Sequence, residues 1–288
     1  MSWPRRLAAT LALSALLGGC AATGGADPVP PPETLRIALV HLAAEPGETE
    51  HNRRQIEAAV AEAIAARADW IVTPELAETG YGFAQKIGTD WIPPFPSPWV
   101  RAMAEVARAN RVALFLGIAE RDAAGGSLHN SVAVIDRDGQ IRGTYRKHRV
   151  INGPSERWAR PGDATPLFAI DGIPVGLLIC ADAYTPELAA AQQRLGARLL
   201  LSPANWAPLG EMGPNGAWEA RSAETGLPLI VNNRTGVEPT IDFSASESAV
   251  VAAGQRLATF TAARTRVFLV DWNLRQGSFT APENPAVR

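Results

Sequence analysis

The sequence predicts a layered α/β domain built from mixed β-sheets. Short apolar runs typical of strands alternate with longer amphipathic stretches typical of helices along most of the chain. The pairs Asp138-Gly139 and Asp171-Gly172 are turn signals of β-hairpins, so antiparallel pairing is expected as well. The run 112–118 is apolar on both faces, which is typical of a strand covered on both sides. We therefore expect two sheets packed together, each with helices on its outer face.

The first half of the expected domain alternates strands with two helices. Ile56, Val60 and Ile64 recur at four-residue spacing and place one apolar face on the first helix. Ser97 is a suitable N-cap for the second helix. The expected elements are strand 35–42, helix 49–67, strand 70–73, helix 98–110 and strands 112–120, 130–136 and 140–146.

The second half opens with the apolar run that ends at Cys180, in which Val175, Leu177 and Ile179 alternate as in a buried strand. The tail from Asn273 shows no period. The remaining expected elements are helix 186–195, strand 198–202, helix 218–225 and strands 229–232, 248–252, 256–260 and 266–271.

Cys180 is the residue that points most directly to chemistry. The only other cysteine is Cys20, near the N-terminus, so Cys180 has no expected disulfide partner. A lone thiol where a buried strand ends can meet a substrate while its backbone stays rigid, which makes it a candidate nucleophile. The alternative is a small buried apolar residue, the role of most free cysteines.

Two charged residues follow other expected strands, Glu75 after 70–73 and Lys147 after 140–146. Burying a carboxylate is costly unless it is paired, and a partly buried lysine is a natural counter-charge. Together with Cys180, Glu75 and Lys147 are suited to an acyl-transfer reaction that passes through a thioester. The carboxylate takes the thiol proton, the thiolate attacks a carbonyl or nitrile carbon, and the ammonium stabilises the developing negative charge. Backbone N–H groups after Cys180, first that of Ala181, would complete an oxyanion site.

The chain resembles the nitrilase, or carbon–nitrogen hydrolase, superfamily, which uses Glu, Lys and Cys in this order. The similarity covers about residues 35–271, and the order and spacing of its motifs are more specific than any one of them. The matching segments are 35–40, 68–76 with Gly80-Tyr81, 129–131, 139–147, Cys180-Ala181-Asp182 with Pro186-Glu187, 202–206 and 232–236.

The resemblance implies a four-layer αββα sandwich that often pairs through its helices, so we expect a homodimer. It implies that Glu75 is the general base and later the acid, Lys147 the electrostatic stabiliser and Cys180 the nucleophile. Glu156 resembles the family's second, supporting glutamate, although a solvated loop carboxylate is the alternative. Candidate pocket residues are Tyr81, Asn205 and Trp206; the aromatic rings could instead be core residues and Asn205 could cap a turn.

The substrate expected from the resemblance is a neutral or small amide. Branches that hydrolyse nitriles usually carry Trp-Glu after the cysteine, whereas this chain carries Ala181-Asp182, as in amidase-type branches. Carbamoylase-like branches often carry arginines shortly after the cysteine, and none stands in residues 183–185. A nitrile is the less favoured substrate.

The N-terminus has the pattern of an export signal. Residues 1–20 combine a basic start, a short apolar run and Leu17-Gly18-Gly19-Cys20, which resembles a bacterial lipobox with Cys20 as the lipidated residue. An ordinary cleaved signal or a twin-arginine signal are alternatives, and all three export the protein. We expect a Pro/Gly-rich linker over 21–34, a hydrolase domain over 35–272, a C-terminal tail over 273–288 and a lipid-anchored, periplasm-facing location in the cell envelope. Ala21 favours the outer membrane by resemblance.

Other functions are less well supported by the sequence. The net charge of −2, from 27 basic and 29 acidic residues, favours no nucleic-acid surface, and no metal or cofactor motif is present. An N-acyltransferase of the same superfamily and a catalytically silent lipoprotein that binds a small molecule or a partner remain alternatives. A papain-like pair of Cys180 with His41 or His148 lacks the local signatures of those enzymes.

Overall fold

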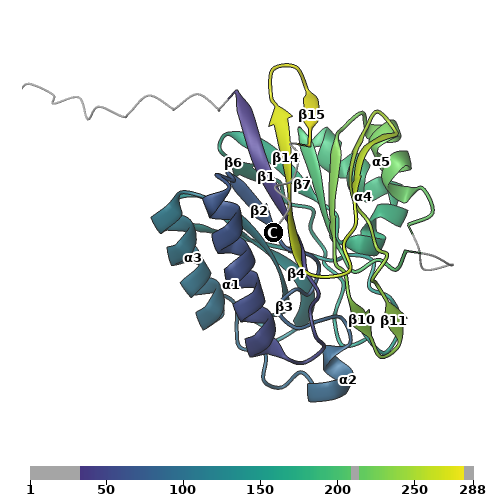
Figure 1. The fold of residues 1–288 in the computed structure, drawn as a ribbon. Coiled ribbons are helices and arrows are strands. Elements are labelled where there is room, and N and C mark those ends of the chain that lie inside the picture. Colours follow the sequence, from purple (N-terminus) through teal and green to yellow (C-terminus); the bar gives the residue numbers. More distant parts are fainter. Residues whose placement is uncertain (1–32, 209–213, 282–288) are drawn as a thin grey trace, which may run out of the picture. The chain divides into compact units, whose positions relative to one another are not determined.

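The computed structural model describes residues 33–208 and 214–281. These residues form the predicted four-layer αββα sandwich, in which two mixed sheets lie face to face between two layers of helices (Figure 1). The expected signal segment with Cys20 and most of the expected linker lie outside the described residues. Within the described ranges, no helix has the length and apolar character needed to cross a bilayer.

The first sheet contains seven described strands and carries both Glu75 and Lys147 just beyond strand ends. Strands β1, β2 and β3 run parallel and the other neighbours are antiparallel. In spatial order the strands are β15 (Ser278–Thr280), β14 (Arg266–Asn273), β1 (Thr34–His41), β2 (Trp70–Val72), β3 (Ala113–Arg121), β4 (Leu128–Ile135) and β5 (Ile141–Arg146).

The second sheet contains six described strands and leads into Cys180. Strands β7, β8 and β9 are parallel, and antiparallel strands flank them. Its order is β13 (Gln255–Phe260), β12 (Ser248–Ala252), β9 (Leu229–Asn233), β8 (Leu199–Ala204), β7 (Ile173–Leu177) and β6 (Phe168–Ile170). A separate short hairpin is formed by β10 (Val237–Glu238) and β11 (Ile241–Asp242).

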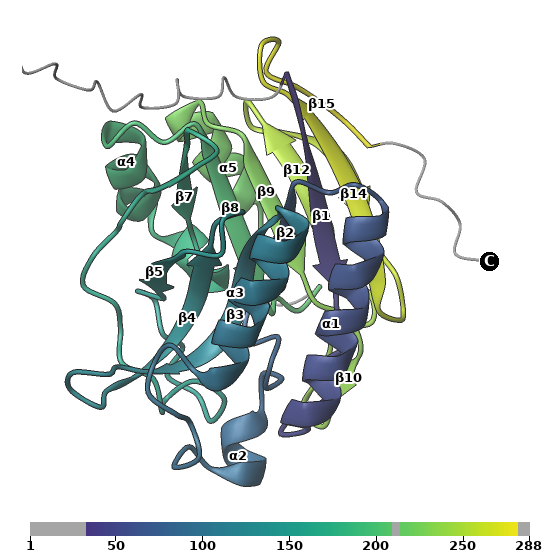
Figure 2. The ribbon, with the colours of Figure 1, turned by 90° about the vertical axis from the view of Figure 1, so that its left-hand side faces the viewer.

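The helices cover the outer faces of the sheets. Helices α1 (Thr49–Ala65) and α3 (Pro98–Asn110) lie over the first sheet (Figure 2), while α4 (Pro186–Arg194) and α5 (Ala217–Thr225) lie on the opposite side. Alternate residues of β1 serve two cores: Ile37 packs in the cluster between the sheets, and Ala38 in the cluster beneath α1 and α3. Apolar side chains on both faces of β1 therefore hold three layers together.

The structure departs from the sequence prediction mainly at short elements. The strand expected to reach Cys180 ends at Leu177, and Cys180 opens a 3₁₀ turn, η1 (Cys180–Tyr184). The tail from Asn273, which shows no period in the sequence, contributes the edge strand β15. Elements of two to five residues, such as β15 and α2 (Phe83–Ile87), are too short to display a hydrophobic period.

Candidate active site

Glu75 lies in the connection that follows β2, held against the neighbouring strand β3. The hydroxyl of Thr73 accepts a hydrogen bond of 2.8 Å from the backbone N–H of Gly117. A Cβ atom on Gly117 would lie 2.0 Å from the carbonyl oxygen of Pro74, so only glycine allows this close approach. The contact fixes the backbone next to Glu75, a residue that is only 1% exposed.

Lys147 follows β5 directly and is fully buried. Its backbone N–H donates to the carbonyl of Asn130 at 2.8 Å, and its carbonyl accepts from Gly162 at 2.8 Å. A Cβ atom on Gly162 would lie 2.4 Å from the carbonyl oxygen of Arg146, so this glycine too is required by close packing. The lysine backbone is thus fixed from both sides.

A buried hydrogen-bond network joins this lysine to two carboxylates. Nζ of Lys147 lies 2.7 Å from Oε1 of Glu75 and 2.6 Å from Oε1 of Glu156. Glu75 also accepts from the side chain of Asn130 at 2.7 Å and from the backbone N–H of Asn205 at 2.8 Å. Because every carboxylate oxygen in the pair has a donor, both charges can stay buried.

Glu156 is anchored by two further donors. The hydroxyl of Tyr81 donates to Oε1 at 2.8 Å, and the backbone N–H of Ile151 donates to Oε2 at 3.0 Å. Burial alone would lower the pKa of Lys147, but the negative charges of Glu75 and Glu156 outweigh it and raise that pKa well above its ordinary value. Lys147 is therefore a permanent cation beside the thiol.

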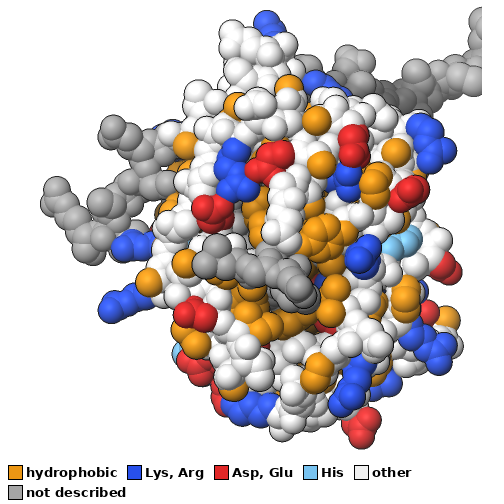
Figure 3. Space-filling view, turned by 90° about the vertical axis from the view of Figure 1, so that its right-hand side faces the viewer, with side chains coloured by type: hydrophobic (Ala, Val, Ile, Leu, Met, Phe, Trp, Pro, Cys, Tyr) orange, Lys and Arg blue, Asp and Glu red, His pale blue; other side chains and the backbone are white. Residues whose placement is uncertain are grey.

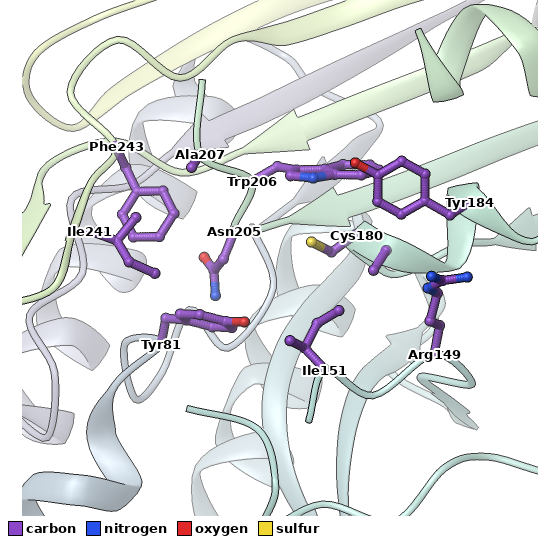
Figure 4. A pocket seen from close by; sticks show the side chains of 11 residues that line it. Tyr81, Arg149, Ile151, Cys180, Tyr184, Asn205, Trp206, Ala207, Ile241 and Phe243 are labelled. Carbon is purple, nitrogen blue, oxygen red and sulfur yellow. The ribbon is translucent and has the colours of Figure 1, made fainter. Parts of the chain in front are cut away.

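Cys180 is the first residue of η1 and has a backbone φ of +48°. This left-handed conformation is uncommon for a residue other than glycine and places the side chain at a sharp turn between strand and 3₁₀ helix. Its sulfur points into the same pocket that Asn205 lines (Figure 4). The turn therefore directs the thiol into the pocket, while the backbone around it is buried.

The pKa of Cys180 lies well above its ordinary value, because the thiol is buried and faces the negative charge of Glu75. The charge of Lys147 and the backbone N–H of Asn205 oppose this rise. The same Asn205 N–H also donates to Glu75, so it lies beside both the carboxylate and the sulfur. The resting group is a neutral thiol, and its proton has to leave as the sulfur attacks.

Asp182 connects the lysine segment to the cysteine turn. One carboxylate oxygen accepts from the backbone N–H groups of His148 at 3.0 Å and Arg149 at 2.7 Å. The other accepts from the backbone N–H of Ile179 at 3.0 Å and the hydroxyl of Tyr145 at 2.9 Å. Burial raises the pKa of this carboxyl group, although its donors oppose the rise.

The pocket above the sulfur has a volume of about 350 Å³ and is mostly apolar. The face of the domain shown in Figure 3 carries a hollow in which apolar side chains gather. In Figure 4, Arg149 and Tyr184 lie on one side of Cys180, and Tyr81 and Phe243 lie on the other. The described lining residues are Tyr81, Arg149, Ile151, Cys180, Ala181, Tyr184, Asn205, Trp206, Ala207, Ile241 and Phe243.

The structure brings most of the sequence candidates together. Tyr81, Ala181, Asn205 and Trp206 line the pocket, and Glu156 completes the lysine network rather than standing in solvent. Neither His41 nor His148 lines the pocket; their ring nitrogens contact Ser248 and the carbonyl of Ala164, respectively.

Sequence reasoning missed Asn130, Asp182 and Arg149 as site residues. Asn130 and Asp182 stood inside motifs that were recognised. The signal available for Asn130 was a polar residue at the start of the apolar run 130–136, and for Asp182 a carboxylate two residues after Cys180. Arg149 carried no such signal. No cluster of three His, Cys, Asp or Glu side chains suited to a metal ion occurs in the part of the chain that the structure describes.

Comparison with known proteins gives matches over most of the chain. The family model for carbon–nitrogen hydrolases matches residues 36–275. An (R)-stereoselective amidase from Pseudomonas sp. is 32% identical over 81% of this chain and 82% of its own length. A nitrilase from Pyrococcus abyssi is 30% identical over 73% and 78%, respectively. A mutant of an amidase from Nesterenkonia sp. AN1, solved in complex with butyramide, superposes with a TM-score of 0.70 at 27% identity over 83% of this chain and 91% of that one.

Proposed function

The chain belongs to the carbon–nitrogen hydrolase family, and we propose that it hydrolyses carboxylic amides through Glu75, Lys147 and Cys180. The observation that carries the proposal is a buried ammonium bonded to two carboxylates, beside a thiol that opens into an apolar pocket. Such a site supplies a base, a fixed positive charge and a nucleophile in one place.

In the first half of the reaction, Sγ of Cys180 attacks the amide carbon while Glu75 takes the thiol proton. Lys147 and the backbone N–H of Ala181 stabilise the negative charge that develops on oxygen. The C–N bond then breaks as Glu75 returns the proton to the nitrogen, which leaves as ammonia or an amine. A thioester on Cys180 remains.

In the second half, water attacks the thioester carbon while Glu75 accepts a proton from it. The C–S bond breaks, the sulfur recovers its proton and the carboxylic acid leaves. The raised pKa of Cys180 supports this concerted scheme, because a neutral thiol needs a base in each cycle.

The choice of an amide over a nitrile rests on the sequence after the nucleophile and on the similar proteins. Ala181-Asp182 departs from the Trp-Glu of nitrile-hydrolysing branches. The test is ammonia release by purified protein from a panel of amides and their matching nitriles, with Cys180→Ala as the control. Amides should react faster, and Cys180→Ala should be inactive. Faster release from nitriles than from every amide tried would contradict the proposal.

We also propose that the protein is exported, lipid-anchored through Cys20 and homodimeric. The lipobox-like Leu17-Gly18-Gly19-Cys20 supports the anchor. Cells fed a radiolabelled fatty acid should label the native protein, and Cys20→Ala should abolish the label and release the protein from membranes. Equal labelling of both proteins would contradict the anchor.

A further inference from the structure

Arg149 is the only charged residue among the described residues that line the pocket. It comes from the segment after Lys147, whereas residues 183–185, shortly after Cys180, contain no arginine. In Figure 4 the guanidinium lies next to Tyr184 at the side of the pocket away from Tyr81 and Phe243. Among the described lining residues, a charged group therefore stands on one side of the pocket only.

The backbone of Arg149 is fixed by a carboxylate, whereas its guanidinium group is not paired with a carboxylate of the described residues. Its backbone N–H donates to the buried carboxylate of Asp182 at 2.7 Å. The guanidinium carbon lies 5.4 Å from the centre of the Tyr184 ring, a cation–π contact that uses the flat face of the group. No ion pair joins Arg149 to a carboxylate of the described residues, so none of these carboxylates occupies the N–H groups at the edge of the guanidinium.

Two other polar side chains that line the pocket, those of Tyr81 and Asn205, do not compete with this cation. Tyr81 already donates to Glu156, and the side-chain nitrogen of Asn205 has no hydrogen-bond partner among the described residues. Both groups lie on the far side of Cys180 from Arg149 (Figure 4). An anionic end of a bound molecule would therefore be attracted to the Arg149 side.

We propose that the physiological substrate is an amide whose far end carries a carboxylate, and that Arg149 binds this carboxylate. The planar guanidinium offers paired N–H donors whose spacing matches the two oxygens of a carboxylate. The inference rests on the proposed amidase function and revises the expectation of a neutral substrate. Arg149 is a specificity residue in this account and takes no part in bond cleavage.

The test compares monoamides of dicarboxylic acids with neutral amides of the same shape. Succinamic, glutaramic and adipamic acids are each paired with the amide in which an isopropyl group replaces the carboxylate. A charged hydrogen bond at a partly solvated site should give the best acidic substrate a kcat/KM about 10- to 100-fold above that of its partner.

Substitution of Arg149 should remove this preference. In Arg149→Ala the ratio of the two kcat/KM values should fall to about one, and Arg149→Lys should keep part of it. Arg157→Ala is the matched control, because Arg157 is exposed, lies nearby in the sequence and does not line the pocket. It should retain the wild-type ratio. The preference should also weaken with added salt.

The outcomes separate this inference from the proposed function. Hydrolysis of the neutral amides with no preference for the acids, or an unchanged ratio in Arg149→Ala, would overturn the inference and leave the amidase function intact. Hydrolysis of no amide would count against the function itself. Calorimetry provides a readout without turnover: Cys180→Ala should bind glutaramate, and the double variant with Arg149→Ala should bind it at least about tenfold more weakly. Equal binding by both would also overturn the inference.

Discussion

At the residue scale, Glu75 has two opposite effects on Cys180. Together with burial, which has the larger effect, its negative charge raises the pKa of the thiol and so favours the protonated sulfur. The same carboxylate is the base that removes the proton when a substrate is present. A thiol with an unusually high pKa is therefore compatible with nucleophilic catalysis, because the base acts only as the new bond forms.

Glu75→Gln should separate these effects. Amide hydrolysis should fall by about 10²- to 10⁴-fold, because the general base is lost. Alkylation of Cys180 by N-ethylmaleimide should become faster, because loss of the negative charge lowers the pKa of the thiol and shifts the alkylation midpoint to lower pH. Alkylation rates across pH, read by peptide mass spectrometry, would test this.

Glu105→Gln is the control for that experiment, since Glu105 is exposed on α3, and it should leave both rates unchanged. An equal or slower alkylation rate in Glu75→Gln would show that the thiol does not sense the charge of Glu75.

At the element scale, Asp182 holds the loop after β5 against the turn that presents Cys180. Its two oxygens accept four hydrogen bonds, three from backbone N–H groups and one from Tyr145. The Lys147 segment and the Cys180 turn come from different sheets, so this carboxylate fixes one relative to the other.

Asp182→Asn should destabilise the protein, because the new amide nitrogen cannot accept the two hydrogen bonds that the oxygen in its place accepts. The expected loss is about 1–3 kcal/mol in the free energy of unfolding, measured with urea. Asp242→Asn makes the same change at the exposed last residue of β11 and should shift stability by less than about 0.5 kcal/mol. Equal effects of the two substitutions would contradict the role of Asp182.

Sequence reasoning worked best where one element carries a complete local signal. Helix α3 occupies its predicted residues because Pro98 stands at its first turn and Ser97 accepts a hydrogen bond from Val100. The Asp171-Gly172 turn was predicted from the Asp-Gly pair, and in the structure both residues adopt the positive φ that such a turn requires. Strand β6, before this turn, has only three residues and was missed.

The site could be predicted only in part, because its geometry depends on contacts between elements that lie far apart in the sequence. The roles of Glu75, Lys147 and Cys180 were predicted from strand ends and a family resemblance, and they stay predictions until tested. The entry of Arg149 into the pocket depends on where the loop after β5 meets η1, a contact between two sheets. No local pattern encodes that contact.

At the scale of the whole molecule, buried polar contacts join the two sheets. His41 at the end of β1 contacts the hydroxyl of Ser248 in β12 at 3.1 Å. Burial lowers the pKa of His41 from 6.5 to about 4, and the charge of Arg234 adds to this effect. Between these pH values the folded protein binds fewer protons at His41 than the unfolded chain, so stability should fall as the pH falls.

His41→Gln should reduce this acid sensitivity. The shift corresponds to at most about 3 kcal/mol of stability lost between pH 6.5 and pH 4. Urea unfolding at both pH values should therefore show a smaller difference in the variant than in the wild type. His51→Gln is the control, because His51 is exposed and should leave the difference unchanged. The same pH difference in His41→Gln and wild type would exclude His41 as the cause.

The most direct test of the central claim is to trap the covalent intermediate. Purified protein is acid-quenched during steady-state hydrolysis of an amide, and its peptides are mapped by mass spectrometry. The account predicts that the peptide containing Cys180 gains the acyl group of the substrate, and that Cys180→Ala neither gains it nor releases ammonia. Continued ammonia release by Cys180→Ala, or an acyl group on a different residue, would contradict the account.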